Sequence, residues 1–231
     1  MDPLLLQTNQ YSSVASAVYN GGIIEVTKRF SNYFSLMANY TYAKAIDTTT
    51  DFNSDFGPQD NTDLNLERGL SSFDQRHRVI AAVVAESPGK GGWTGAWQLA
   101  PIFRYSSGFP FNLLAGADVN GDRHSTNDRP IGAGRNTGLG PNYIDLDLRL
   151  TKGFALGERA QLMVVAEGFN LFNRANFASI NNVVGPTCPE CSVLGHTFVQ
   201  NGLGSVIPSQ GLGFTSALIP RQIQLGMRFT F

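Results

Sequence analysis

The stretch that decides the fold is residues 220–231, which read Pro220-Arg221-Gln222-Ile223-Gln224-Leu225-Gly226-Met227-Arg228-Phe229-Thr230-Phe231. From position 222 onward, polar or small residues alternate with apolar ones without exception. A period of two residues places the two kinds of side chain on opposite faces of a β-strand. Because chain ends usually fray, a strand pattern that continues to an aromatic last residue suggests that something holds or reads this end.

The composition argues against several classes of protein. A net charge of −1 gives no basic surface for nucleic acid. Charged residues make up 15% of the chain, well below the roughly one quarter that is usual for soluble domains. No apolar run approaches the ~18 residues of a transmembrane helix, and residues 1–7 have neither the basic start nor the long apolar run of a signal peptide. We therefore expect either a cytosolic protein or a chain that lacks its true beginning.

Upstream of the last strand, the same alternation recurs and no helix is predicted. The final strand covers Ile223–Phe231. The other predicted strands are Gly21–Phe30, Tyr33–Ile46, Gln75–Glu86, Trp93–Ser106, Asn142–Phe154 and Ala160–Asn173. The alternation is poorest at the end of the last of these, where residues 169–173 are expected to form a β-bulge.

The connections between the seven predicted strands alternate in length. Residues 31–32, 87–92 and 155–159 are short turns, whereas residues 47–70, 107–141 and 174–218 are long loops. In an up-and-down antiparallel sheet, all short turns then lie at one end and all long loops at the other. This arrangement is typical of an outer-membrane β-barrel, and strands of about 10–14 residues fit a tilted crossing, which needs ~9–11.

The two faces of the predicted strands differ in chemistry. One face is rich in Leu, Ile, Val and Phe, and the other carries Glu25, Arg29, Asn39, Arg104, Asp145, Asp147, Arg149, Gln222, Gln224 and Arg228. A lipid-facing wall cannot hold these polar side chains, but a wet barrel interior can. Aromatic residues gather at the predicted strand ends, as in interfacial girdles, with Tyr40, Tyr42, Tyr105 and Tyr143 toward the long loops. A soluble β-sandwich with an apolar core is the alternative, but it does not explain the segregated loops.

Several motifs, in this order, resemble the C-terminal part of TonB-dependent outer-membrane receptors, specifically the Oar-like barrels. They are Thr27-Lys28-Arg29-Phe30, residues 39–47 (Asn-Tyr-Thr-Tyr-Ala-Lys-Ala-Ile-Asp), Asp74-Gln75-Arg76-His77-Arg78, residues 105–111 (Tyr-Ser-Ser-Gly-Phe-Pro-Phe), Asn127-Asp128-Arg129-Pro130, residues 169–177 (Phe-Asn-Leu-Phe-Asn-Arg-Ala-Asn-Phe) and the terminus. The resemblance covers nearly the whole chain. It implies that residues 1–231 are the C-terminal portion of a barrel of about 22 strands. Seven strands cannot close as an up-and-down barrel, and nothing resembles a plug, a TonB box or a regulatory domain, so we expect a truncated protein or a gene fragment.

The resemblance also implies a function and partners. It implies energy-coupled uptake of a bulky nutrient, with the TonB complex acting through the missing N-terminal parts. An Oar-like adhesion, secretion or structural surface role is the first alternative, and a soluble β-rich binding module is the second. The expected partners are outer-membrane lipid, an unidentified ligand and the barrel assembly machinery, and the expected location is the outer membrane of a Gram-negative bacterium, with a periplasmic C-terminus. The assembly signal would be Ile223, Leu225, Met227, Phe229 and Phe231.

Two loop motifs could carry further chemistry. Asp118, Asn120, Asp122 and Asp128 offer oxygen ligands that match the first half of a calcium loop, although an Asx-rich turn without metal explains them too. Cys188 and Cys191 form one C-x-x-C, for which we favour a loop disulfide over free thiols or a metal site with His196. Calcium is thus the one cofactor that the sequence suggests. The three histidines form no visible triad with a nucleophile, and we expect no enzymatic activity.

Overall fold

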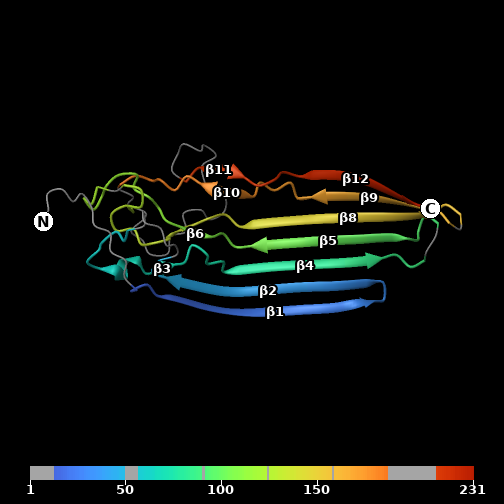
Figure 1. Cartoon of the computed structure of the whole chain (residues 1–231), viewed down its shortest axis with the longest axis horizontal. Helices are drawn as coiled ribbons and strands as arrows, with labels where there is room; N and C mark the ends of the chain where they lie inside the picture. Colours follow the sequence, from blue (N-terminus) through green and yellow to red (C-terminus); the bar gives the residue numbers. More distant parts are fainter. Residues whose placement is uncertain (1–12, 50–56, 90–91, 124, 158, 187–211) are drawn as a thin grey trace.

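One antiparallel sheet dominates the computed structural model, which describes residues 13–49, 57–89, 92–123, 125–157, 159–186 and 212–231 (Figure 1). Its main path follows chain order: β1 (Ala17–Ser31), β2 (Phe34–Asp47), β4 (His77–Glu86), β5 (Trp97–Ser106), β8 (Tyr143–Ala155), β9 (Gln161–Phe169) and β12 (Gln222–Thr230). A short strand, β3 (Gly69–Leu70), pairs with the end of β2. The predicted all-β, up-and-down antiparallel arrangement is confirmed, and the sheet is open between β1 and β12.

The short and long connections lie at opposite ends of the sheet, as predicted (Figure 1). The tightest turn joins β1 to β2 through Asn32 and Tyr33, whose φ angles are 50° and 70°. Positive φ at both central residues is the geometry that matches the twist of a two-residue hairpin. We call this end the turn end and the opposite one the loop end.

The predicted bulge at residues 169–173 is wrong. β9 ends at Phe169, and Asn170 and Asn173 take φ angles of 48° and 50°. The Asn170 side chain donates to the Arg174 carbonyl at 2.9 Å and accepts from its N–H at 3.1 Å. Asparagine tolerates this left-handed conformation and closes turns with its own side chain. The segment is therefore a turn that leaves the sheet and not a distortion within it.

Cross-strand register confirms the two chemically different faces, because directly paired residues lie on the same face. One continuous row joins Glu25, Asn39, Ile80, Arg104 and Asp145 across five strands. We call the face with this row the polar face. The neighbouring row on the opposite face contains only apolar side chains: Val26, Ala38, Ala81, Phe103 and Leu146.

The aromatic residues at the loop end follow the prediction in part. Tyr40, Tyr42 and Tyr105 lie on the apolar face. Tyr143 pairs with Ser106 and lies on the polar face, so its assignment to the girdle with the other three is wrong. The register shows that Tyr143 belongs to the same side of β8 as Asp145.

The long connections fold into a second layer at the loop end, which we call the loop cap (residues 57–76, 107–123, 125–142, 170–186 and 212–221). It holds the 3-10 helix η1 (Leu64–Glu67) and two small sheets, β6 (Pro110–Phe111) with β7 (Gly138–Leu139) and β10 (Phe177–Ile180) with β11 (Phe214–Ala217). Its small apolar core is built around Leu113 and Ala133. The described residues include no helix with the length and apolar character required to cross a membrane.

Candidate functional site

Arg104 is the centre of a charge cluster on the polar face. Its Nε lies 3.1 Å from Asp145 Oδ2, and its guanidinium also bonds Asp147 on the same strand, β8. The side chains of Asp145 and Asp147 are 6% and 17% exposed, whereas that of Arg104 is 39% exposed. The carboxylates therefore lie beneath the arginine, and the guanidinium forms the accessible surface.

A second ion pair continues along the polar face toward β12. Arg149 Nε lies 3.6 Å from Glu167 Oε1. Among the described arginines of this face, Arg149 is the one that contacts Glu167. Glu167 pairs in register with Gln224, whereas Arg228 lies opposite Met163.

Two buried ion pairs, which the sequence analysis missed, hold the loop cap together. Arg129 and Glu67 form a bidentate pair with N–O distances of 2.7 and 2.8 Å, and their side chains are 5% and 4% exposed. Arg135 Nη1 lies 2.5 Å from Asp47 Oδ1 and 3.0 Å from the Asp47 carbonyl. Since Asp47 is the last residue of β2, this second pair fastens the cap to the sheet.

The environment of Glu67 favours its ionised form. Burial by itself would raise the pKa of the carboxyl group. The hydrogen bonds from Arg129 and from the Gln59 N–H, together with the charges of Arg129 and Arg135, outweigh burial and hold the pKa of Glu67 below its ordinary value. The pair is thus a salt bridge at neutral pH.

The oxygens proposed for calcium are used mainly as turn caps. Asp118 accepts from the Gly121 N–H at 2.6 Å and from the Arg123 N–H at 2.9 Å, and Asn120 accepts from the Asp122 N–H at 2.9 Å. Asp128 Oδ2 accepts from Val119, while its buried Oδ1 has no hydrogen-bond partner. In the described part of the chain, no three His, Cys, Asp or Glu side chains are grouped to hold a metal ion. This geometry favours the Asx-turn explanation, and calcium stays a prediction.

The other candidates from the sequence are the two cysteines and the histidines. Cys188, Cys191 and His196 lie outside the described residues. His77 lies on the apolar face, where its Nδ1 is 2.9 Å from the Tyr40 hydroxyl. This hydrogen bond gives the imidazole a structural partner at the loop end of the sheet.

Two lysines on the apolar face turn back to the turn end. Lys28 Nζ donates to the Ser31 carbonyl and hydroxyl and to the Phe34 carbonyl at 2.7–2.9 Å, and it lies 3.7 Å above the Phe34 ring. Lys152 Nζ donates to carbonyls of residues 92, 93 and 95. Each ammonium group therefore keeps polar partners at the edge of an apolar surface, as lysines do at a membrane interface.

β12 presents its apolar side chains without cover. Ile223 is 70% exposed, Leu225 and Met227 are 80% exposed, Phe229 is 56% exposed and Phe231 is 95% exposed. A soluble protein rarely exposes a contiguous apolar surface of this kind. An environment other than water must therefore contact this face.

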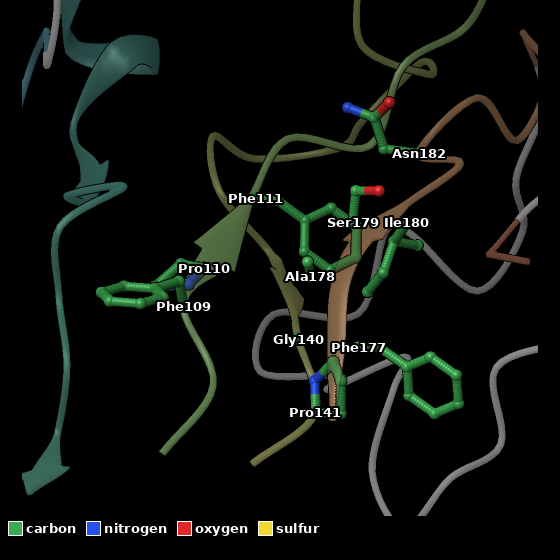
Figure 2. A pocket seen from close by; sticks show the side chains of 10 residues that line it. All are labelled: Phe109, Pro110, Phe111, Gly140, Pro141, Phe177, Ala178, Ser179, Ile180 and Asn182. Carbon is green, nitrogen blue, oxygen red and sulfur yellow. The ribbon is translucent and has the colours of Figure 1, made fainter. Parts of the chain in front are cut away.

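Two cavities adjoin where the polar face meets the loop cap. The first, of about 280 Å³, is lined by Phe109, Pro110, Phe111, Gly140, Pro141, Phe177, Ala178, Ser179, Ile180 and Asn182 (Figure 2). The second, of about 300 Å³, is lined by Gln75, Arg78, Val79, Ile80, Arg104, Tyr105, Ser106, Phe109 and Tyr143. Phe109 borders both cavities, so they are neighbours.

An apolar outer face, a charged polar face and long loops at one end define a β-sheet protein of a lipid bilayer. The family model described as "Outer membrane beta barrel domain" matches residues 3–133 and 131–224, so the chain belongs to this family. No curated protein and no solved structure matches the chain. Membership identifies an outer-membrane protein, which agrees with the exposed apolar face and favours it over the soluble alternatives.

Proposed function

We propose that the chain forms the C-terminal wall of a larger TonB-dependent, Oar-like barrel that imports a bulky nutrient across the outer membrane. The observation that carries this proposal is the meeting of the charged polar face with a folded loop cap, with two cavities at their junction. A water-filled barrel interior explains why the Arg149 and Glu167 side chains are half-exposed. A loop cap that covers the barrel and retains a ligand explains why the cap is packed. We expect no enzymatic role.

The partners follow from the two ends of the sheet. We infer that the turn end, with Phe231, faces the periplasm and that the loop cap faces the cell exterior. The apolar side chains of β12 would contact lipid and would first be recognised by the barrel assembly machinery. Deleting Phe231 should lower insertion into the outer membrane without changing synthesis, and equal insertion of the two chains would contradict this role.

Uptake can be tested in cells that carry or lack the complete protein. The experiment offers labelled oligosaccharides, peptides and iron chelates and measures accumulation with and without a proton gradient. We expect one class to accumulate only when the protein and the gradient are both present. Accumulation that ignores the gradient would indicate a passive pore and would contradict energy coupling.

The packed loop cap also fits the alternative of a surface or adhesion role, because it presents a structured outer surface. This alternative predicts that cells lacking the protein lose cell–cell aggregation or surface attachment while all three classes of nutrient accumulate as before. Such a result would replace the transport proposal.

A further inference from the structure

The first cavity, which Phe111 and Phe177 line (Figure 2), offers a preformed surface for a flat or branched apolar group. The Phe177 ring stacks on Phe214 with centroids 3.7 Å apart and an interplanar angle of 5°. The Phe111 ring fills the space beside Gly138, where an added Cβ would lie 2.5 Å from the ring. Both rings are therefore held in place before any ligand arrives.

The polar groups of this cavity already have partners. The Ser179 hydroxyl hydrogen-bonds the hydroxyls of Thr215 and Ser216 at 2.6 Å, and the Asn182 amide donates to the Asn112 carbonyl at 2.9 Å. None of the described residues that line this cavity carries a charge. A ligand group in this cavity would gain mainly from apolar and ring contacts.

The neighbouring cavity has the opposite character. Arg78 and Arg104 line it on adjacent strands, and they are diagonal neighbours because Arg78 pairs with Ser106. Such neighbours lie about 7–8 Å apart, within reach of long side chains. Arg104 is neutralised by the carboxylates beneath it. The Arg78 side chain is exposed and has no hydrogen-bond or ion-pair partner in the described part of the chain.

The donors around Arg78 suit a negatively charged group. Gln75 and Ser106 line the same cavity and bring an amide and a hydroxyl group, whereas the Tyr143 hydroxyl already bonds Asp145 and Arg104. A guanidinium binds carboxylate or phosphate oxygens with two parallel N–H···O bonds. The Asp145 carboxylate does not attract a cationic ligand to this cavity, because its side chain is only 6% exposed and is bonded to Arg104.

Phe109 connects the two cavities. Its side chain is 50% exposed. Figure 2 shows the Phe109 ring beside Pro110, pointing away from the rings of Phe111 and Phe177. A ligand that spans both cavities would pass along this ring.

We propose that the two cavities form one site for an amphipathic anion, which is a molecule with an aromatic or branched apolar group joined by a short linker to a carboxylate or phosphate. Arg78 binds the anion, Phe109 contacts the linker, and the cavity between Phe111 and Phe177 takes the apolar group. This inference rests on the proposed transport function, for which it names the chemical class of substrate.

The test measures binding of 4-(4-fluorophenyl)butyrate to the complete protein, as used in the uptake test, in zwitterionic lipid nanodiscs by fluorine NMR, with empty nanodiscs as the blank. The matched probes are the corresponding alcohol and amine, which keep the ring and change only the charge. Because a hydrogen bond to a charged group contributes about tenfold in affinity, the carboxylate should bind about tenfold more tightly than the alcohol. Equal binding of the carboxylate and the alcohol, or tighter binding of the amine, would overturn the proposal without requiring any variant.

Two arginine variants then locate the anion. Arg78→Gln should weaken carboxylate binding about tenfold and leave alcohol binding unchanged. Arg149→Gln removes an arginine from the same face outside the cavity and should change neither. An equal loss in both variants would contradict the assignment of Arg78. If the complete protein binds the carboxylate but shows no gradient-driven uptake, the transport proposal alone is refuted. If it shows gradient-driven uptake but no preference for the carboxylate over the alcohol, the proposed site alone is refuted.

Discussion

The Arg149–Glu167 pair and the Arg129–Glu67 pair use the same chemistry in two different regions of the molecule. On the polar face of the sheet, the side chains of Arg149 and Glu167 are 53% and 32% exposed, and one contact of 3.6 Å joins them. In the loop cap, the side chains of Arg129 and Glu67 are 5% and 4% exposed and are joined by two short hydrogen bonds. Water solvates the first pair and is excluded from the second.

This difference separates two roles for charge. An exposed pair contributes little to stability, because each partner is solvated equally well alone. A buried pair makes each partner indispensable, because removing one leaves an uncompensated charge in a dry site. The Arg149–Glu167 pair therefore stays solvated on the sheet, whereas the buried pair holds the layers of the cap together.

The largest effect is expected from breaking the buried pair. Glu67→Gln leaves Arg129 without its carboxylate and should destabilise the loop cap by about 3–5 kcal/mol. Protease susceptibility of the cap in increasing urea measures this loss. Asp60→Asn is the control, since Asp60 is a partly exposed acid of the same cap whose side chain bonds Thr62. If the two variants are cleaved alike, the buried pair has no special role.

The next largest effect on stability is expected from placing a charge on the apolar face of β4, compared with the polar face at the same depth in the membrane. Val83 lies on the apolar face and Ala82 on the polar face, one residue apart. Val83→Arg should cost about 2–4 kcal/mol in a bilayer, because it places a charge against lipid, whereas Ala82→Arg should cost close to nothing. Urea titration of the folded fraction, read from electrophoretic mobility with and without heating, gives both values. Equal costs would mean that neither face contacts lipid selectively.

A smaller effect is expected from acid. The folded cap holds the pKa of Glu67 below its ordinary value of 4.5. The stability from this group is therefore complete above about pH 4.5 and is lost as pH falls through the lowered pKa. Protease susceptibility of the cap should rise over that window in the wild type, and Glu67→Gln should lack this component. An identical acid response in the variant would assign the effect to other groups.

The smallest effect is expected on the polar face. Arg149→Ala should change the free energy of unfolding by at most about 1 kcal/mol, and salt should reduce the difference further. The same urea titration at low and high salt measures it. A loss as large as that of Glu67→Gln would show that this face is dry.

Alternation along the chain predicted the sheet well, because a period of two is a local property that one covered face enforces over many strands. It placed Arg104, Asp145 and Asp147 correctly on one face. It failed at the end of β9, where Asn170 takes a left-handed turn. The error at Tyr143 came from grouping it with the other tyrosines, since alternation by itself places it on the same face as Asp145.

The loop cap could not be predicted for a different reason. Glu67 and Arg129 are 62 residues apart, and neither position shows a pattern that points to the other. The stretch around Arg129 contributed to the resemblance, but its carboxylate partner did not. The two cavities likewise depend on how separate loops meet over the sheet, and Arg78 becomes a candidate only because no partner for it lies among the described residues.

The central claim is that one face of the sheet contacts water and the other contacts lipid, and single-cysteine labelling tests it most directly. Ala81→Cys and Ala82→Cys place equally small thiols on opposite faces of β4, in a chain whose Cys188 and Cys191 are changed to serine. A water-soluble maleimide is applied to the complete protein in its membrane. We predict rapid labelling of the cysteine at position 82 and almost none at position 81. Equal labelling, or the reverse preference, would contradict the account.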